Sequence, residues 1–300
     1  MIVNPAAGRA RGERRSARRR AELEAAVERL RGGGADLELA VSDSPDDALK
    51  RARIAAEAGR DLVAAGGDGT AGAIAGVAAD TGRRLTIVPL GSGNDFARGL
   101  GYDLKRPAAA LDLIGDAGAD RTIDLGQANG TWYAGVTCSG FDAEVNRWAN
   151  SVQRLSGTAL YIVAVLRTLA VYTPRSFAVT IDGVRKEHNA WMVSVGNNTT
   201  YGGGMRIVPD ARLEDGLLDV CVIGACSKLK LVANFPRVFS GGHGRIPETQ
   251  FFRGATVVVE SLEPPDAARP AEVWADGERV GPLPATMTVV ANALTVRVPR

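Results

Sequence analysis

The sequence has few of the residues that build disulfide frameworks and zinc sites. Its 300 residues include three cysteines and two histidines. Cys138, Cys221 and Cys226 form no CxxC pair, which favours buried free thiols in a reducing compartment over a disulfide framework. We expect no zinc site of the histidine type, and we place His188 and His243 at the surface.

Long uncharged apolar runs are also missing. The longest, residues 160–173, contains Arg167 and is too short to span a bilayer. Arginines from position 9 onward interrupt any apolar run near the start, so no signal peptide is visible. Residues 1–3 resemble the end of a strand, which leaves open whether the native chain starts upstream of Met1. These features predict a cytoplasmic protein.

Lysine is scarce. None of the five lysines follows a glycine and no GxxxxGK[ST] segment exists, so a P-loop is excluded. The formal net charge is only +2, but residues 9–20 contain seven arginines and one acid. We favour a solvated start of a helix for this run, with contact to anionic lipid as the alternative. Nucleic-acid binding is not expected, because no aromatic residues lie among the arginines.

The chain divides into two halves with different sequence patterns. Up to about residue 125, short apolar runs alternate with helical patterns, which predicts a parallel α/β sheet. The expected strands are residues 2–3, 37–41, 62–65, 85–89 and 122–125. Beyond that point strand-like runs follow one another without helical spacers, which predicts mainly antiparallel β structure. We therefore expect domains over 1–125 and 126–300, and leave open a return of the last residues to the first domain.

Local signals add detail to this plan. An apolar stripe from Leu23 to Leu30 predicts a helix that glycines 32–34 end. Ser44 is expected to cap the next helix, with Asp47 closing a capping box. In the second half we expect one helix over 151–171 and a hairpin turn at residues 182–183.

Three glycine-containing turns follow apolar runs in the first half, at residues 4–8 (NPAAG), 66–70 (GGDGT) and 89–96 (PLGSGNDF). In a parallel sheet such turns open at one edge, where ligands bind. Glycines let main-chain amides approach phosphate oxygens, and the following helix N-terminus favours negative charge. The three turns together predict a phosphate site without a loop lysine.

Asp68 is unusual within the second turn. A carboxylate beside bound phosphate is repelled unless it holds a metal ion or takes up a proton. Capping of the next helix is an equally weighted alternative. The spacing Gly67-x-Gly69-x-x-Gly72 also matches a dinucleotide fingerprint, but the acid expected at the end of the next strand is missing.

These motifs resemble the diacylglycerol kinase catalytic-domain family, which includes bacterial lipid kinases and sphingosine kinases. The resemblance continues through GFDA at 140–143, VGNN at 195–198, YGGG at 201–204, PDA at 209–211, DGLLDV at 215–220 and DGE at 276–278. It covers nearly the whole chain in order. It implies a doubly wound nucleotide-binding domain followed by a β-sandwich domain, and it implies ATP and Mg²⁺.

The resemblance also implies roles for individual residues. The expected ATP-binding residues are Asn4, Pro5, Gly8, Ser42, Gly66, Gly67, Asp68, Gly69, Thr70, Ser92 and Asn94. A magnesium site is implied at the Asp215 carboxylate with the main-chain carbonyls of Arg212 and Leu217, which are hard oxygen ligands. The expected catalytic acids are Asp68, Glu278 and Asp276, and which of them is the base stays open.

The favoured function is therefore an ATP-dependent lipid kinase, with conversion of diacylglycerol to phosphatidic acid as the leading reaction. An NAD kinase-like phosphotransferase and a non-catalytic nucleotide- or lipid-binding regulatory protein remain as alternatives. The run from Asn94 to Arg98 favours the lipid branch. We expect a lipid partner met by peripheral contact with the membrane surface, no nucleic acid, and leave a homodimer open.

Overall fold

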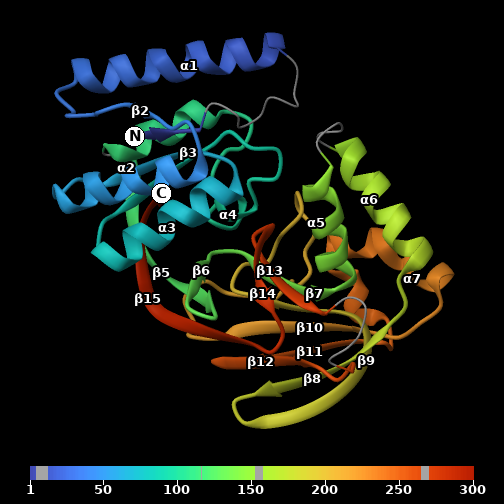
Figure 1. The fold of residues 1–300 in the computed structure, drawn as a ribbon. Coiled ribbons are helices and arrows are strands. Elements are labelled where there is room, and N and C mark those ends of the chain that lie inside the picture. The colour runs from blue at the N-terminus through green and yellow to red at the C-terminus, as the bar shows by residue number, and fades with distance from the viewer. Residues whose placement is uncertain (5–12, 116, 153–157, 265–269) are drawn as a thin grey trace. The chain divides into compact units, whose positions relative to one another are not determined.

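A computed structural model describes residues 1–4, 13–115, 117–152, 158–264 and 270–300 (Figure 1). The chain divides into two compact units. Unit 1 comprises Met1–Asp124 together with Ala291–Arg300, and unit 2 comprises Leu125–Val290. Within the described ranges, no helix has both the length and the apolar character needed to cross a membrane.

Unit 1 contains a parallel sheet whose strand order is β2-β1-β3-β4-β15. Its strands are β1 (Ile2–Val3), β2 (Ala40–Val41), β3 (Leu62–Gly66), β4 (Leu85–Pro89) and the end of β15 (Ala285–Pro299). Every residue of β3 and β4 is buried, as expected for central strands covered on both faces. The predicted parallel α/β character of this half is confirmed.

The helices of unit 1 are α1 (Glu13–Gly32), α2 (Pro45–Glu57), α3 (Asp68–Thr81), α4 (Asp95–Gly99) and the 3₁₀ segment η2 (Pro107–Ile114). Leu23 on α1 is buried and the helix ends at Gly32, which confirms both local predictions. Ser44 caps α2 by accepting the Asp47 amide at 3.1 Å. The Asp47 carboxylate accepts the Asp43 amide, so it does not close the predicted box on Ser44 itself.

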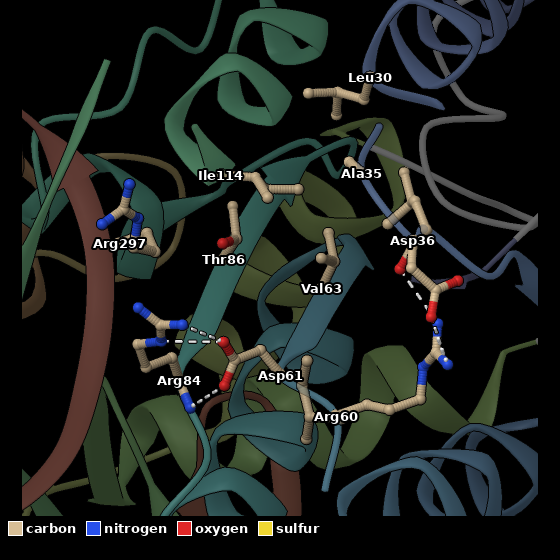
Figure 2. A pocket seen from close by; sticks show the side chains of 12 residues that line it. Leu30, Ala35, Asp36, Arg60, Asp61, Val63, Arg84, Thr86, Ile114 and Arg297 are labelled. Carbon is tan, nitrogen blue, oxygen red and sulfur yellow. Dashed lines mark hydrogen bonds and ion pairs between the residues drawn. The ribbon is translucent and has the colours of Figure 1, made fainter. Parts of the chain in front are cut away.

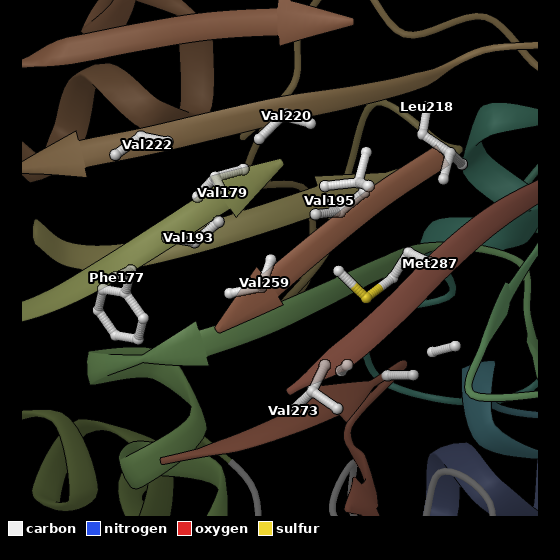
Figure 3. Packing of buried hydrophobic residues seen from close by; sticks show 14 of the residues in the cluster. Phe177, Val179, Val193, Val195, Leu218, Val220, Val222, Val259, Val273 and Met287 are labelled. Carbon is white, nitrogen blue, oxygen red and sulfur yellow. The ribbon is translucent and has the colours of Figure 1, made fainter. Parts of the chain in front are cut away.

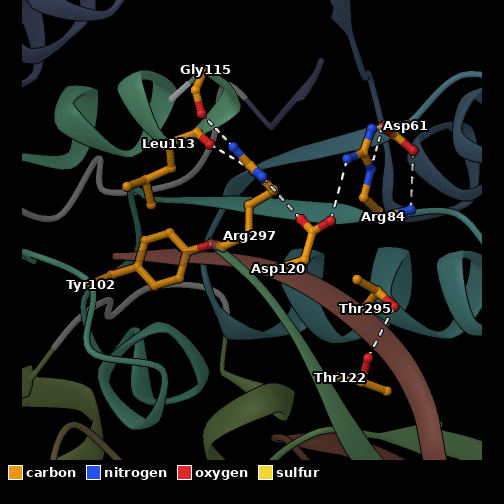
Figure 4. Close-up of polar contacts among 9 residues, drawn as sticks. All are labelled: Asp61, Arg84, Tyr102, Leu113, Gly115, Asp120, Thr122, Thr295 and Arg297. Carbon is orange, nitrogen blue, oxygen red and sulfur yellow. Dashed lines mark hydrogen bonds and ion pairs between the residues drawn. The ribbon is translucent and has the colours of Figure 1, made fainter. Parts of the chain in front are cut away.

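Side chains tie the C-terminal strand segment to unit 1 (Figure 4). The Arg297 guanidinium donates to the Leu113 carbonyl at 2.7 Å and pairs with Asp120 at 3.1 Å. The Tyr102 hydroxyl donates to the main-chain carbonyl of Arg297. Asp120 also pairs with Arg84 at 3.4 Å. The last strand is thus held by its backbone and by an ion-pair network.

Unit 2 is a sandwich of antiparallel strands. These are β7 (Val136–Gly140), β8 (Arg175–Ile181), β9 (Val184–Gly196), β10 (Leu218–Gly224), β11 (Thr249–Gly254), β12 (Thr256–Ser261), β13 (Glu272–Ala275), β14 (Glu278–Pro282) and the start of β15. The first half of β9 pairs with β8, and its second half lies between β7 and β10. Valine, phenylalanine and methionine side chains from these strands form one buried core (Figure 3). The β-sandwich class is confirmed.

Two further strands, β5 (Gly118–Ala128) and β6 (Thr131–Tyr133), pair with each other in antiparallel orientation. The predicted hairpin turn is confirmed: Ile181 pairs with Val184, and the turn residues Asp182 and Gly183 have φ values of 46° and 86°. Positive φ at both positions is what this tight turn requires.

The helices of unit 2 are α5 (Phe141–Ser151), α6 (Thr158–Val171), α7 (Lys228–Asn234) and the 3₁₀ segments η3 (Phe235–Ser240) and η4 (Gly242–Arg245). The expected single helix over 151–171 is therefore wrong at its start, and α5 was not predicted. The surface position expected for His243 is also wrong. Its side chain is buried, with Nε2 at 3.1 Å from the Ile207 carbonyl oxygen.

Candidate functional site

The second and third glycine turns touch each other at the carboxyl ends of β3 and β4. The amides of Leu90 and Gly91 donate to the Gly66 carbonyl at 2.8 and 3.2 Å. A Cβ on Gly91 would lie 2.5 Å from the Gly67 Cα, and a Cβ on Gly66 would lie 2.6 Å from the Thr70 Cβ. Such contacts are far below van der Waals distance. The two turns therefore require glycine for packing as well as for access of a ligand to the main chain.

Helix α3 begins at this edge without a side-chain cap. Its N-cap is Gly67, whose lack of a side chain leaves first-turn amides without the usual intramolecular acceptor. Uncapped amides and the positive end of the helix dipole suit a phosphate group. The cradle in unit 1 thus suits the chemistry of a phosphate group, which is the ligand that the glycine pattern predicts.

Asp68 is the first residue of α3, but its carboxylate does not cap that helix. Oδ1 accepts the Phe96 amide at 3.0 Å, in the first turn of α4. Burial raises the pKa of Asp68, the nearby Asp95 adds to this, and the hydrogen bond from Phe96 opposes it. The alternative that Asp68 caps the next helix is therefore wrong, because its carboxylate instead accepts an amide of α4, which orients it.

Asn4 and Ser42 follow the two neighbouring strands at the same edge. The Asn4 side-chain amide donates to the Thr70 hydroxyl at 3.0 Å, which connects the first turn to the second. Ser42 is buried, and its hydroxyl donates to the Val3 carbonyl at 3.1 Å. Its hydrogen is therefore engaged within the sheet, so Ser42 reaches a ligand only through its lone pairs. Pro5 and Gly8 lie outside the described residues.

The third turn is shaped by Asn94. This residue has φ 53°, and its side-chain amide donates to the Gly91 carbonyl at 2.8 Å. Its Oδ1 is buried and has no hydrogen-bond partner within the described structure. Ser92, at the tip of the same turn, is exposed. Asn94 thus supports the loop, while Ser92 is placed where a ligand could meet it.

A hollow of about 320 Å³ lies at the opposite, amino-terminal edge of the same sheet (Figure 2). Its charged groups are engaged in pairs. Arg60 contacts Asp36 at 3.0 Å, and Arg84 contacts Asp61 at 2.7 Å. Ligands of open α/β sheets bind at the carboxyl ends of strands, so we assign this hollow a structural role.

Asp276 and Glu278 belong to unit 2, at the turn between β13 and β14. The Asp276 carboxylate accepts three main-chain amides: Ala134 to Oδ2 at 2.8 Å, and Gly135 and Val136 to Oδ1 at 3.0 and 3.1 Å. Asp276 thus fixes the segment that enters β7. Glu278 begins β14 and is exposed. Of these two acids, Glu278 has the carboxylate that a substrate could approach.

The expected magnesium ligands lie in the segment from Arg212 to Leu217 of unit 2. Arg253 pairs with Asp215 and also with Asp219, the latter at 3.1 Å. Oδ2 of Asp219 is buried without a hydrogen-bond partner, and burial raises the pKa of this acid. Leu217 donates its amide to Asp215 at 3.1 Å, and Arg212 is exposed. Carboxylate and carbonyl oxygens are the type of donor that Mg²⁺ binds. In this structure the Arg253 guanidinium balances the charge of the Asp215 carboxylate.

Among the residues that the structure describes, no three acidic, histidine or cysteine side chains gather as a metal site. A magnesium site at Asp215 would therefore depend on main-chain oxygens for the remainder of its ligands. Such oxygens are usual partners of a hard cation.

An apolar cavity of about 370 Å³ in unit 2 was not predicted. Helix α6, the sheet and the segments α7 and η3 line it, and the lining includes Leu169, Trp191, Met205, Ile207, Leu231 and Phe235. Leu166 and Val232 also line the cavity, and 61% and 50% of their surfaces, respectively, are exposed to solvent. Asp142 and the Lys230–Glu248 ion pair add polar groups to the lining.

Family models match both units. Residues 1–128 match the diacylglycerol kinase catalytic domain, and residues 135–298 match the YegS C-terminal domain, described as an NAD kinase β-sandwich-like domain. The chain belongs to the diacylglycerol kinase catalytic-domain family. It is thus a member of a lipid kinase family, as the glycine turns and downstream motifs predict.

Curated members of this family resemble the chain over most of its length. A diacylglycerol kinase of Mycobacterium tuberculosis is 36% identical over 92% of this chain and 89% of its own length. A "Probable lipid kinase YegS-like" protein of Pseudomonas fluorescens is 33% identical over 93% of this chain and 91% of its own length. A crystal structure of a Bacillus anthracis diacylglycerol kinase shares the fold, with a TM-score of 0.71, 22% identity and coverage of 100% and 95%.

Sequence reasoning missed three features of the site. The Phe96 amide that orients Asp68 is a main-chain group, so the residue type at position 96 does not reveal this contact. The amides held by Asp276 are likewise invisible, although Gly135 is required there because its Cβ would lie 2.4 Å from Asp276 Oδ1. The lining of the apolar cavity has the composition of an ordinary core.

Proposed function

We propose that this member of the diacylglycerol kinase family transfers the γ-phosphoryl group of ATP to the hydroxyl of diacylglycerol and forms phosphatidic acid. The observation that carries the choice of acceptor is the apolar cavity of unit 2. Its volume lies within the range of small-molecule sites, ~300–1,000 Å³. An apolar lining with exposed apolar residues beside it suits an acyl chain and does not suit NAD, which is charged and polar.

The glycine cradle of unit 1 supports ATP as the donor. Main-chain amides at the start of α3 and in the turn after β4 would bind phosphate oxygens, and Asn4 and Thr70 would hold the two neighbouring turns in register. Magnesium bound with the nucleotide would neutralise phosphate oxygens. We propose Asp215 with the carbonyls of Arg212 and Leu217 as the ligands of a separate, structural Mg²⁺ in unit 2.

The proposed reaction balances as a direct displacement. The lipid hydroxyl oxygen bonds to the γ-phosphorus while the bond from that phosphorus to the bridging oxygen breaks, so ADP leaves. The hydroxyl proton passes to a carboxylate. We assign this role to Asp68 or Glu278 rather than Asp276, because both oxygens of Asp276 already accept main-chain amides.

Transfer of labelled phosphate from ATP tests this proposal. The acceptors are dispersed diacylglycerol, sphingosine and NAD, each with and without Mg²⁺, and the product is identified after extraction. We expect labelled phosphatidic acid that requires Mg²⁺. Labelled NADP instead would favour an NAD kinase-like enzyme, and no labelled product with any lipid would overturn the proposed activity.

Asp215→Ala tests the metal ligands separately. We expect wild-type protein to melt at higher temperature when Mg²⁺ is added, since a ligand at 100 times its dissociation constant stabilises the native state by ~2.7 kcal/mol. The variant should lose this increase, while Asp36→Ala, which changes an exposed acid of unit 1, should keep it. An equal increase in Asp215→Ala would reject these ligands.

A further inference from the structure

The apolar cavity of unit 2 has an open end and a closed end, which the exposure of its lining residues distinguishes. Leu166 and Val232 are half exposed or more, whereas Trp191 and Met205, which line the same cavity, are only 1% and 3% exposed. We call the part lined by Trp191 and Met205 the closed end. A lipid chain that enters from solvent passes the exposed residues first, so its terminal methyl group lies at the closed end.

A short glycine loop borders the closed end. Tyr201 and Met205 exchange two main-chain hydrogen bonds of 3.0 Å, and both residues line the cavity. The three residues between them, Gly202, Gly203 and Gly204, have φ values of 60°, 88° and 109°. Residues with a side chain rarely adopt such values, so the loop backbone favours glycine. This loop is the YGGG segment, which has no part in the proposed phosphate cradle or metal site.

Gly202 has a second constraint that Gly203 lacks. A Cβ on Gly202 would lie 2.3 Å from Cε of Met205, whereas a Cβ on Gly203 would have no atom within 4 Å. The terminal methyl of Met205 therefore occupies the space that a side chain at position 202 would need. Backbone conformation favours glycine at both positions, but contact with the cavity wall requires it only at Gly202.

Packing limits where the end of Met205 can go when that space is filled. Met205 belongs to a buried cluster with Met192, Ile207 and Val238, and buried side chains are close-packed. The cavity is the open space beside this cluster. Methionine has three rotatable side-chain bonds, so its end moves at low cost. A methyl group added at Gly202 should therefore push the end of Met205 into the closed end and shorten the cavity.

We propose that Gly202 sets the length of the lipid chain that the apolar cavity accepts, because it keeps the end of Met205 out of the closed end. Gly202 is thus a positioning residue, which acts on the substrate through Met205. The proposal rests on the proposed function in taking the cavity as the site of an acyl chain. It adds a limit on that chain, whose terminal methyl group reaches Met205 and extends no further.

Kinetics on diacylglycerols of graded chain length test this role. Dioctanoyl, didecanoyl, dimyristoyl and dipalmitoyl glycerol are compared in detergent micelles with wild type and Gly202→Ala. In the variant, the KM for the long-chain lipids should rise about fourfold for each methylene that no longer fits, since burial of one methylene contributes ~0.8 kcal/mol. The KM for dioctanoyl glycerol and the kcat for every lipid should stay as in wild type.

Two matched variants separate chain length from general damage. Gly203→Ala adds the same methyl at a positive φ without the Met205 contact, so it should keep the wild-type dependence on chain length. Met205→Leu combined with Gly202→Ala should restore that dependence, because leucine lacks the Cε atom and the exchange is tolerated in cores. Equal shifts in the two glycine variants, no rescue by Met205→Leu, or an equal rise in KM for all four lipids would overturn the proposal.

Binding without turnover separates this inference from the proposed function. Calorimetry measures the affinities of octyl, decyl, dodecyl and tetradecyl alcohol for the same proteins. Affinity should rise with chain length in wild type and level off at a shorter alcohol in Gly202→Ala. The same length dependence in both proteins, or no binding of any alcohol by wild type, would overturn the role of Gly202. Expected alcohol binding without turnover of any diacylglycerol would refute the proposed function and support the role of Gly202.

Discussion

Unit 1 and unit 2 present their functional groups in different ways. In unit 1 the candidate phosphate cradle is main chain, and its shape is set by close contacts between turns such as that of Gly91 with Gly67. In unit 2 the candidate acyl-chain cavity is lined by side chains, including those of helix α6. A main-chain site constrains residue identity through sterics, whereas a side-chain cavity tolerates any set of apolar residues with suitable volume. Substitutions should therefore act by steric exclusion in unit 1 and by volume or charge in unit 2.

The largest expected effect comes from Asp68→Asn. Loss of a proton acceptor costs ~10²–10⁴-fold in turnover. The fold should survive, because the asparagine oxygen can still accept the Phe96 amide. Labelled-phosphate transfer and a melting curve measure the two properties. Asp46→Asn, an exposed acid at the start of α2, serves as the control and should keep wild-type turnover. Turnover within a few-fold of wild type in Asp68→Asn would remove this residue from the mechanism.

Gly91→Ala tests whether the cradle is defined by sterics. The added Cβ would meet the Gly67 Cα at 2.5 Å, so one turn must move. We expect a loss of ~1–3 kcal/mol in unfolding free energy, typical of overpacking, and weaker ATP binding by calorimetry. Gly281→Ala in β14 adds the same methyl where nothing lies within 4 Å and should be nearly neutral. Equal behaviour of the two variants would contradict this account.

Leu169→Trp tests the corresponding rule in unit 2. The larger side chain should fill part of the apolar cavity, and the KM for long-chain diacylglycerol should rise about tenfold, or ~1.4 kcal/mol. The KM for ATP should not change. Leu169→Met conserves volume and should behave like wild type. A rise in both KM values for Leu169→Trp would indicate general damage and would count against an acyl-chain site.

The smallest expected effect is a difference between two acids of unit 1 in how their substitution changes stability with pH. The folded-state pKa of Asp68 is raised by burial, so its ionisation opposes folding and stability declines as pH rises through that pKa. Asp68→Asn should therefore match wild type at low pH and melt higher at neutral pH. Arg297 lowers the pKa of Asp120, so ionised Asp120 stabilises the fold and this stability is lost as pH falls. Asp120→Asn should melt lower at neutral pH, and the same sign in both variants would exclude this origin.

The same contrast explains what could be predicted from sequence. The turn at residues 66–70 is visible because close packing requires glycine there, and the hairpin at Asp182 because its positive φ values favour particular residues. The α/β class of the first half and the antiparallel β character of the second follow from hydrophobic periodicity, whereas the β-sandwich was implied by the family resemblance. Helix α5 was missed because it directly follows the buried strand β7, and its buried positions, such as Val145, merge with that apolar run. The burial of His243 depends on tertiary packing around Ile207, which no local pattern records.

The candidate site was partly visible for a similar reason. Asp68 is conspicuous in a glycine turn, but the hydrogen bond that orients it comes from a main-chain amide 28 positions later. Asp276 looks like a hairpin residue and a catalytic candidate, and only the structure shows three amides converging on it. The apolar cavity draws on α6, β9, α7 and η3, so its lining is dispersed in the sequence.

The return of the final ten residues to unit 1 has a consequence for biosynthesis. Val296 pairs with Leu85, so a strand of the unit 1 sheet is synthesised after the whole of unit 2. Unit 2 is continuous and can complete its own pairing beforehand. A nascent chain that stops before residue 291 would therefore carry a finished unit 2 and an unfinished unit 1, and removal of residues 291–300 should damage the unit that is made first.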